Sequence, residues 1–163
     1  ERVKDMLEEI TESGHKALIF SQWEQVTSVY KEALKAYNPA YIVGAVDPED
    51  RQKEVDRFQN NPTCKVAIGT IGAMGTGLTM TAASYVFFVD KRYWDAENKQ
   101  AEDRAHRIGT TNTVNVVSLV ATNTVDEGIE EMLRDNKALF DRVVEGKGSR
   151  VDMGEILRKI LQY

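Results

Sequence analysis

The sequence predicts an α/β fold in which a mainly parallel β-sheet is flanked by helices on both faces, with a C-terminal helical extension. Two observations lead to this prediction. Short apolar runs with strand character alternate along the chain with longer stretches of helical period. Runs such as Val86–Val89 are apolar on both faces, which is typical of parallel strands buried between two helical layers.

Five runs are predicted to be strands because they are short and rich in apolar or β-branched residues. They are Lys16–Ser21, Ala40–Val43, Lys65–Gly69, Tyr85–Val89 and Val114–Val120. Parallel strands that are joined by helices usually place their ligand-binding loops at the carboxyl edge of the sheet. We therefore expect the functional loops of this chain at that edge.

Helical segments are predicted between and after these runs from the spacing of their apolar residues. The three clearest are Glu24–Tyr37, Pro48–Gln59 and Val125–Val144. In the second, Asp47 is the predicted N-cap and Pro48 the first helical residue, where a missing N–H does no harm. In the third, Thr124 and Glu127 have the spacing of a capping box.

The length of 163 residues suits one domain with a buried core. We expect this domain to cover residues 1–147. A glycine-containing joint at Gly146–Ser149 then leads into a short amphipathic helical extension, residues 148–163, which must pack on another surface.

Composition excludes several classes of protein. No run approaches the roughly 18 apolar residues of a membrane span, and Glu1–Glu9 is too charged for a signal peptide. We therefore expect an intracellular protein without a membrane partner, cytoplasmic if bacterial or phage, which the compact acidic chain favours, and nuclear if eukaryotic. Cys64 and two histidines form no metal-ligand pattern, so no metal site is expected. The net charge of -5 argues only weakly against nucleic acid, because it averages over all faces.

The segment Gln100–Gly109 carries the clearest chemical signal, because Arg104 and Arg107 are three residues apart. On a helix this spacing places both guanidinium groups on one face, where they suit the phosphates of a nucleotide. The alternative is a solvated helix face on which Asp103 or Glu102 pairs with the arginines.

This segment resembles motif VI of the Swi/Snf family of helicase-like motors, with matches that include Gln100, Asp103, Arg104, His106 and Arg107. The resemblance implies a RecA-like fold, and that Arg104 and Arg107 reach ATP on another lobe as arginine fingers, with Gln100 nearby. Thr110 stands where the family commonly has glutamine.

Upstream, the glycine-rich stretch Thr70–Ala83 is similar to motif V of the same family. The resemblance implies that Gly75 and Gly77 line the ATP cleft and that Thr70 contacts DNA phosphate. Met74 and Thr79 depart from the family pattern, in which glycine and asparagine are usual.

Three further segments resemble the family's DNA-contacting regions. Ser21 and Gln22 end the first strand, in a match to motif IV, and Gly44 and Arg51 follow the second strand. Arg51 has an alternative role as an ion-pair partner of Asp47 or Glu54. Trp94 matches a family tryptophan after the fourth strand, and its alternative role is packing in a half-buried position.

The sequence contains neither a Gly-x-x-x-x-Gly-Lys-[Ser/Thr] loop nor an Asp-Glu-x-His box, so it lacks the usual elements that hold ATP and Mg²⁺. The resemblance implies that a preceding RecA-like lobe supplies them and that this chain alone is inactive. We expect the intact protein to be an ATP hydrolase that moves along double-stranded DNA.

Two alternatives differ in substrate or class. One is a lobe of an RNA or single-strand helicase, although such enzymes usually have arginine at the position of Thr110. The other is a non-catalytic α/β binding module, against which the intact arginine pair argues. If the chain is a motor lobe, Thr70–Ala83 and Gln100–Gly109 are expected side by side at the carboxyl edge of the sheet, with Arg104 and Arg107 exposed in the isolated lobe.

Overall fold

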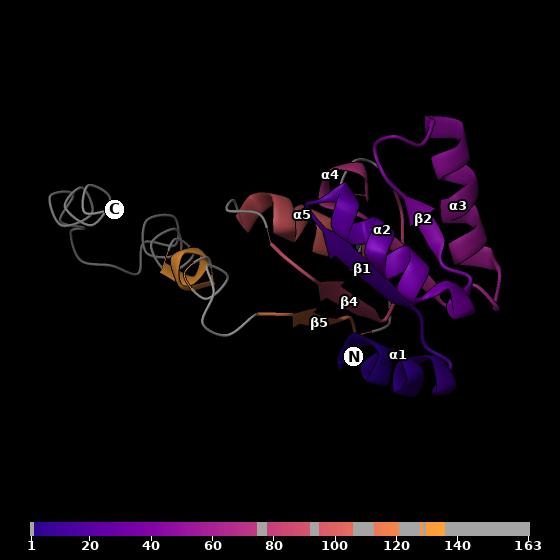
Figure 1. Ribbon diagram of the computed structural model, residues 1–163, viewed down its shortest axis with the longest axis horizontal. Helices are drawn as coiled ribbons and strands as arrows, with labels where there is room; N and C mark the ends of the chain where they lie inside the picture. The colour runs from indigo at the N-terminus through magenta and orange to yellow at the C-terminus, as the bar shows by residue number, and fades with distance from the viewer. Residues whose placement is uncertain are drawn as a thin grey trace, which may run out of the picture.

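The computed structural model describes residues 2–74, 78–91, 95–105, 113–120, 128 and 130–135. Its elements alternate as the sequence predicts (Figure 1). In chain order they are α1 (Arg2–Glu12), β1 (Ala17–Ser21), α2 (Glu24–Ala33), η1 (Lys35–Tyr37), β2 (Ala40–Ile42), α3 (Pro48–Asn60), β3 (Val66–Thr70), α4 (Ile71–Met74), β4 (Tyr85–Phe88), α5 (Asp95–Ala105) and β5 (Asn115–Ser118). Residues 130–135 are also helical.

The five strands form one sheet in the order β2-β3-β1-β4-β5, and every pair is parallel. This confirms the predicted parallel sheet. Each observed strand lies within its predicted run, except that β3 extends one residue further, to Thr70. The central strand β1 is buried at all five positions because it lies between β3 and β4 under two helical layers.

Alternate residues of β1 enter two separate cores, as the pleat of a strand requires. Leu18 and Phe20 belong to the core that α3, α4 and α5 cover. Ala17 and Ile19 belong to the opposite core, covered by α1 and α2. The sheet is therefore flanked by helices on both faces, as predicted.

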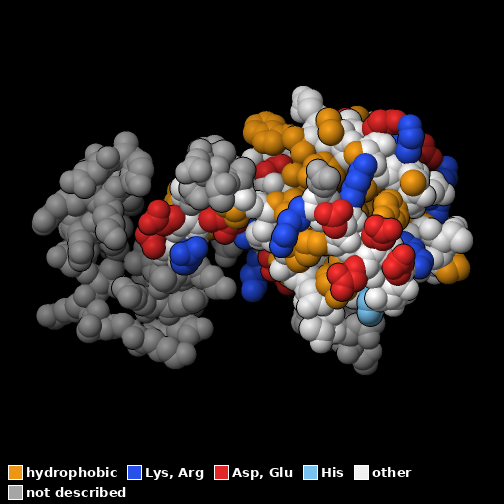
Figure 2. Space-filling model, turned by 60° about the horizontal axis from the view of Figure 1, so that its bottom comes forward, with side chains coloured by type: hydrophobic (Ala, Val, Ile, Leu, Met, Phe, Trp, Pro, Cys, Tyr) orange, Lys and Arg blue, Asp and Glu red, His pale blue; other side chains and the backbone are white. Residues whose placement is uncertain are grey.

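Helix α1 was not among the predicted elements, because the high charge of the N-terminal segment obscures its short apolar face. It buries Val3, Leu7 and Ile10, whose spacing places them on one face. Its other faces carry four acidic and two basic residues, and acidic side chains are prominent on this side of the molecule (Figure 2). Part of the negative charge thus lies away from the carboxyl edge.

Asp47 occupies the N-cap position of α3, with Pro48 following it, but its side chain makes no capping hydrogen bond. The predicted position is right and the predicted capping bond is wrong. The capping box at Thr124 and Glu127 and the extension at 148–163 lie outside the described residues. Among the helices that the structure describes, none combines the length and apolar character needed to cross a membrane.

Two lysines at the amino edge of the sheet cap the C-termini of helices by donating hydrogen bonds to carbonyl oxygens there. Lys16 Nζ donates to the carbonyl oxygens of Phe58 and, at 2.8 Å, of Asn61, at the end of α3. Lys65 Nζ donates to the carbonyl oxygen of Thr11, in the last turn of α1. Burial lowers the pKa of Lys16, against the opposing effect of Cys64. This part of the amino edge therefore serves the fold.

Candidate functional site

The carboxyl ends of β2, β3, β1 and β4 form a continuous row, in which the predicted residues Thr70 and Ser21 are neighbours. They are register partners, since β1 and β3 pair from Ala17 with Val66 to Ser21 with Thr70. Both side chains are mostly buried, with 1% of Ser21 and 9% of Thr70 exposed. The strands thus bring together two residues that lie far apart in the sequence.

Asp90, just beyond the end of β4, fastens the end of β1. Its carboxylate accepts the hydroxyl of Ser21 at one oxygen and the backbone N–H of Gln22, at 2.7 Å, at the other. Sequence analysis assigned no role to Asp90. The available signal was an acidic residue at the end of a buried strand, but the neighbour it would meet depends on the strand order.

The hydroxyl of Ser21 also accepts the backbone N–H of Trp23 at 3.0 Å. Trp23 stands at the N-cap position of α2, and 56% of it is exposed. Sequence analysis did not select it either. Its exposure at this edge gives the row a large apolar side chain next to Gln22.

The short helix α4 follows Thr70 directly, and Thr70 Oγ1 accepts the N–H of Ala73 at 3.4 Å. Met74, which departs from the family pattern, packs over Gly69. A Cβ atom on Gly69 would lie 2.3 Å from Met74 Sδ and 2.1 Å from the carbonyl oxygen of Ile42. The larger residue at position 74 therefore fits because position 69 has no side chain.

The later described part of motif V, residues 78–83, leads to the amino end of β4. There, Gln59 of α3 holds it with two hydrogen bonds, accepting the N–H of Ala82 at 2.8 Å and donating to Thr81 Oγ1 at 3.1 Å. Met80 N–H donates to the carbonyl oxygen of Arg104 at 3.0 Å. Motifs V and VI are thus side by side, as expected.

The prediction that both motifs lie at the carboxyl edge is wrong for Arg104. Helix α5 begins after the carboxyl end of β4 and leads back toward the amino end of β5, so its last residues lie away from the carboxyl edge. Of the described residues of motif V, Thr70 is at that edge, as the register partner of Ser21. The sequence prediction placed both motifs there because it assigned each loop to a strand end without following the direction of the helix.

Arg104 is half-buried, whereas the sequence predicted it to be exposed. Gln100, one turn earlier on α5, is exposed. The Nε of Arg104 is buried and has no hydrogen-bond partner. Among the described residues, no carboxylate pairs with this guanidinium, so Asp103 does not neutralise it. An arginine held in this way keeps its charge available to a ligand.

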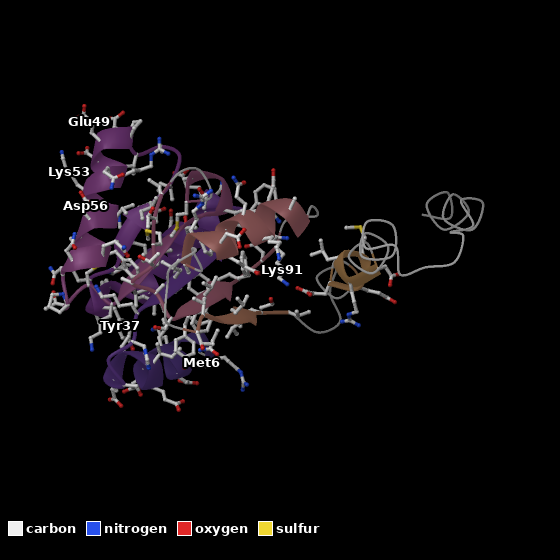
Figure 3. The ribbon with its side chains drawn as sticks, turned by 180° about the vertical axis from the view of Figure 1, so that it is seen from behind. Met6, Tyr37, Glu49, Lys53, Asp56 and Lys91 are labelled. Atoms are coloured by element: carbon white, nitrogen blue, oxygen red, sulfur yellow. The ribbon has the colours of Figure 1, made fainter. Side chains whose placement is uncertain are left out.

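At the other end of the row, Gly44 is exposed and Arg51 is half-buried in the first part of α3. Within the described part of the chain Arg51 pairs with neither Asp47 nor Glu54, because Glu54 binds Arg57 instead at 2.7 Å. The Nε of Arg51 is buried and has no hydrogen-bond partner. The exposed face of α3, with Glu49, Lys53 and Asp56, points away from the sheet (Figure 3).

The predicted residues Gly75, Gly77, Trp94 and Arg107 lie outside the described residues. Over the ranges that are described, no three His, Cys, Asp or Glu side chains come together in a group that could hold a metal ion. The structure therefore locates seven predicted site residues: Ser21, Gln22, Gly44, Arg51, Thr70, Gln100 and Arg104.

Comparison with protein families gives a match to the helicase conserved C-terminal domain over residues 1–109. Protein CHROMATIN REMODELING 19 of Arabidopsis thaliana is 35% identical over 96% of this chain, and the endonuclease and DNA annealing helicase ZRANB3 of Mus musculus is 36% identical over 94%. Helicase SWR1 of Candida glabrata is 32% identical over 86%. The chain spans only 22%, 15% and 10% of these three proteins, respectively.

Among solved structures, the C-terminal part of the Fun30 ATPase domain superposes with a TM-score of 0.76 at 28% identity, covering 81% of this chain and 44% of that one. The three relatives come from a plant, a yeast and a mouse, so they give no support to the expected bacterial or phage source. The chain therefore belongs to the helicase conserved C-terminal domain family, as the C-terminal, RecA-like lobe of a Swi/Snf-type helicase-like ATPase.

Proposed function

We propose that this chain is the second motor lobe of an ATP-dependent translocase on double-stranded DNA. In this proposal ATP and Mg²⁺ are held mainly by a preceding RecA-like lobe of the same protein. This lobe supplies Arg104 and Arg107 as arginine fingers with Gln100 beside them, and Gly75 and Gly77 line its side of the ATP cleft. By analogy with its relative Protein CHROMATIN REMODELING 19, the intact protein acts on chromatin in the nucleus.

The observation that carries the proposal is the separation of two surfaces on one rigid sheet. Thr70 and Ser21 lie at the carboxyl edge, whereas the backbone of Arg104 is bonded to Met80, in the segment that leads to the amino end of β4. One five-residue strand spans roughly 15 Å between these edges. A lobe built in this way can hold a DNA strand at one end and meet ATP at the other.

The chemistry at the ATP side is electrostatic. Phosphoryl transfer spreads negative charge over the phosphate oxygens, and a planar guanidinium can bind two of those oxygens at once. Arg104 is suited to this role because no carboxylate among the described residues competes for it. Closure of the two lobes would bring the fingers to the nucleotide, and hydrolysis would release them.

At the DNA side, the proposed contacts are Gln22, Gly44, Arg51, Thr70 and Trp94. Ser21 has a different part, because its hydroxyl already bonds to Asp90 and to the backbone of Trp23. We assign to Ser21 the positioning of this edge, and to the half-buried side chain of Gln22 a contact with the sugar-phosphate backbone.

The test uses the intact protein and measures ATP turnover with duplex DNA, single-stranded DNA and RNA. Arg104→Lys and Arg107→Lys should each lower duplex-stimulated turnover at least about 10-fold, because a complete finger contributes roughly 10³-fold or more in related chemistry. Nucleotide-free DNA binding should stay within about twofold. Arg2→Lys, on the exposed surface of α1, is the matched control and should change neither property.

If both finger variants kept wild-type turnover but lost nucleotide-free DNA binding, Arg104 and Arg107 would belong to the DNA side and the proposal would fail. Stimulation by RNA alone would transfer the lobe to an RNA helicase. The isolated lobe should show no DNA-stimulated hydrolysis, and turnover that survives removal of contaminating ATPases would overturn the half-site assignment.

A further inference from the structure

Lys91 follows Asp90 at the carboxyl end of β4 and forms an ion pair with a distant part of the chain. Its Nζ lies 3.1 Å from Glu130 Oε1, in the helical segment of residues 130–135. The two side chains are 20% and 25% exposed. Figure 3 shows Lys91 on the side of the sheet that faces this helical segment.

The position of Lys91 in the sheet connects it to the carboxyl-edge row. Asp90 is bonded to Ser21 and Gln22, so Lys91 is one residue away from the end of β1. Arg51 follows β2 at the opposite end of the same row, and the strand order between them is β2-β3-β1-β4. Three strand spacings cover about 14 Å. A cation thus lies at each end of the row that contains Thr70 and Ser21.

The two cations differ in their partners. Arg51 has no carboxylate partner among the described residues, whereas Lys91 is neutralised by Glu130. A lysine ammonium is a compact charge with rotatable donors, so it can exchange one anion for another. The exchange replaces one anionic partner of Lys91 by another, and the counterions that phosphate binding releases from the DNA favour it.

We propose that Lys91 is a reserve contact for the DNA backbone, which Glu130 masks in the free lobe and a phosphate group takes over on binding. The exchange also releases the helical segment of residues 130–135 from the end of β4, so DNA binding at the row is coupled to the position of that segment. This inference rests on the proposed function, since it requires DNA at the carboxyl edge.

The test measures nucleotide-free binding of a mixed-sequence DNA duplex to the intact protein over a range of salt concentrations. Glu130→Gln should tighten binding by about 3- to 10-fold, because Lys91 no longer has to leave a carboxylate. Lys91→Gln should weaken binding and reduce the slope of log affinity against log salt by about 0.9, the value for one phosphate contact. Lys91→Arg should keep that slope.

Two controls separate local unmasking from a change in net charge. Glu131→Gln removes the same charge from the neighbouring exposed residue, which is not paired with Lys91, and should change affinity by less than half as much on the logarithmic scale. In the Lys91→Gln background, Glu130→Gln should give no more gain than Glu131→Gln gives. Thermal unfolding of each variant identifies any loss of the fold, and Lys91→Arg then carries the comparison.

An equal gain from Glu130→Gln and Glu131→Gln, or a gain from Glu130→Gln that keeps its full size without Lys91, would overturn this inference and leave the proposed function intact. The proposed function fails separately if Arg51→Gln and Thr70→Val leave duplex binding unchanged, because the carboxyl edge would then not contact DNA.

Discussion

Ser21 and Thr70 are register partners at the last positions of β1 and β3, yet their hydroxyl groups have different environments. Ser21 Oγ donates to Asp90 and accepts the N–H of Trp23. Thr70 Oγ1 accepts one long hydrogen bond, 3.4 Å, from the N–H of Ala73. One hydroxyl therefore stabilises the edge of the sheet, and the other has more bonding capacity left for a ligand.

Removal of each hydroxyl in turn should distinguish its contribution to stability from its contribution to DNA binding. Thr70→Val should weaken duplex binding by about 2- to 10-fold, the equivalent of one hydrogen bond, and change the free energy of unfolding by less than about 1 kcal/mol. Ser21→Ala should cost about 1–3 kcal/mol of stability, because the Asp90 carboxylate loses a donor. Urea unfolding and fluorescence anisotropy measure the two properties. A larger stability loss for Thr70→Val than for Ser21→Ala would contradict this assignment.

Gly69 and Met74 should show coupled effects on stability. Gly69→Ala is expected to cost about 1–3 kcal/mol or more, since the new methyl group meets Met74 Sδ and the carbonyl oxygen of Ile42. In a Met74→Ala background the cost of Gly69→Ala should decrease but not vanish, because the Ile42 carbonyl belongs to the neighbouring strand and remains in place. Urea unfolding of the four proteins gives the interaction energy. Strictly additive effects would show that Met74 does not depend on Gly69.

The sheet was predictable from the sequence because its inner strands β1 and β3 are buried at every position and therefore carry a nearly continuous apolar pattern. Such a pattern reports burial without tertiary information, and the five strands end within two residues of the predicted ends. Helix α1 was missed although Val3, Leu7 and Ile10 have helical spacing. The segment also carries four acidic and two basic residues, which obscure the short apolar face of the helix.

The candidate site was less accessible to sequence reasoning, since its geometry depends on strand order and helix direction. The partnership of Asp90 with Ser21 exists because β4 lies next to β1, which no local pattern reports. Met74 departs from the family pattern of motif V, and the residue that accommodates it, Gly69, lies on another element. Prediction of the position of Arg104 would have required knowledge of the direction in which α5 crosses the sheet. Each of these is a property of tertiary structure.

Acid should weaken the attachment of α3 to β2 through Glu54. Burial acts to raise the pKa of Glu54, but hydrogen bonds from Arg57 and from the N–H of Tyr41, with the charge of Lys31, lower it overall. The folded pKa is therefore below the ordinary value of 4.5. It follows that the stabilisation by ionised Glu54 is present above pH 4.5 and is lost as the pH falls through the lower folded pKa.

Glu54→Gln tests this pH dependence. The variant should be less stable than the wild type by about 1–3 kcal/mol near neutral pH, because the contacts with Arg57 and Tyr41 lose their charge. The difference should shrink as the pH falls below 4.5. Urea unfolding at several pH values measures it. A difference that stays constant down to pH 3 would mean that the carboxylate does not gain from these donors.

Gly44→Ala should be the reverse of Gly69→Ala, with no loss of stability and a loss of DNA affinity. No heavy atom lies within 4 Å of a Cβ built on Gly44, and its φ is outside the left-handed region that favours glycine. Alanine should therefore leave the free energy of unfolding unchanged or raise it by up to about 1 kcal/mol, since it restricts the unfolded chain.

The fold thus gives no reason for glycine at position 44, but close approach of a phosphate to the backbone amide does. A methyl group there should keep the phosphate at a distance and weaken duplex binding several-fold, with little change in the salt dependence because no charge is removed. Unfolding and anisotropy titrations on the same variant decide the matter. Wild-type affinity in Gly44→Ala would remove the β2–α3 loop from the DNA surface, and a clear loss of stability would show that glycine serves the fold at this position instead.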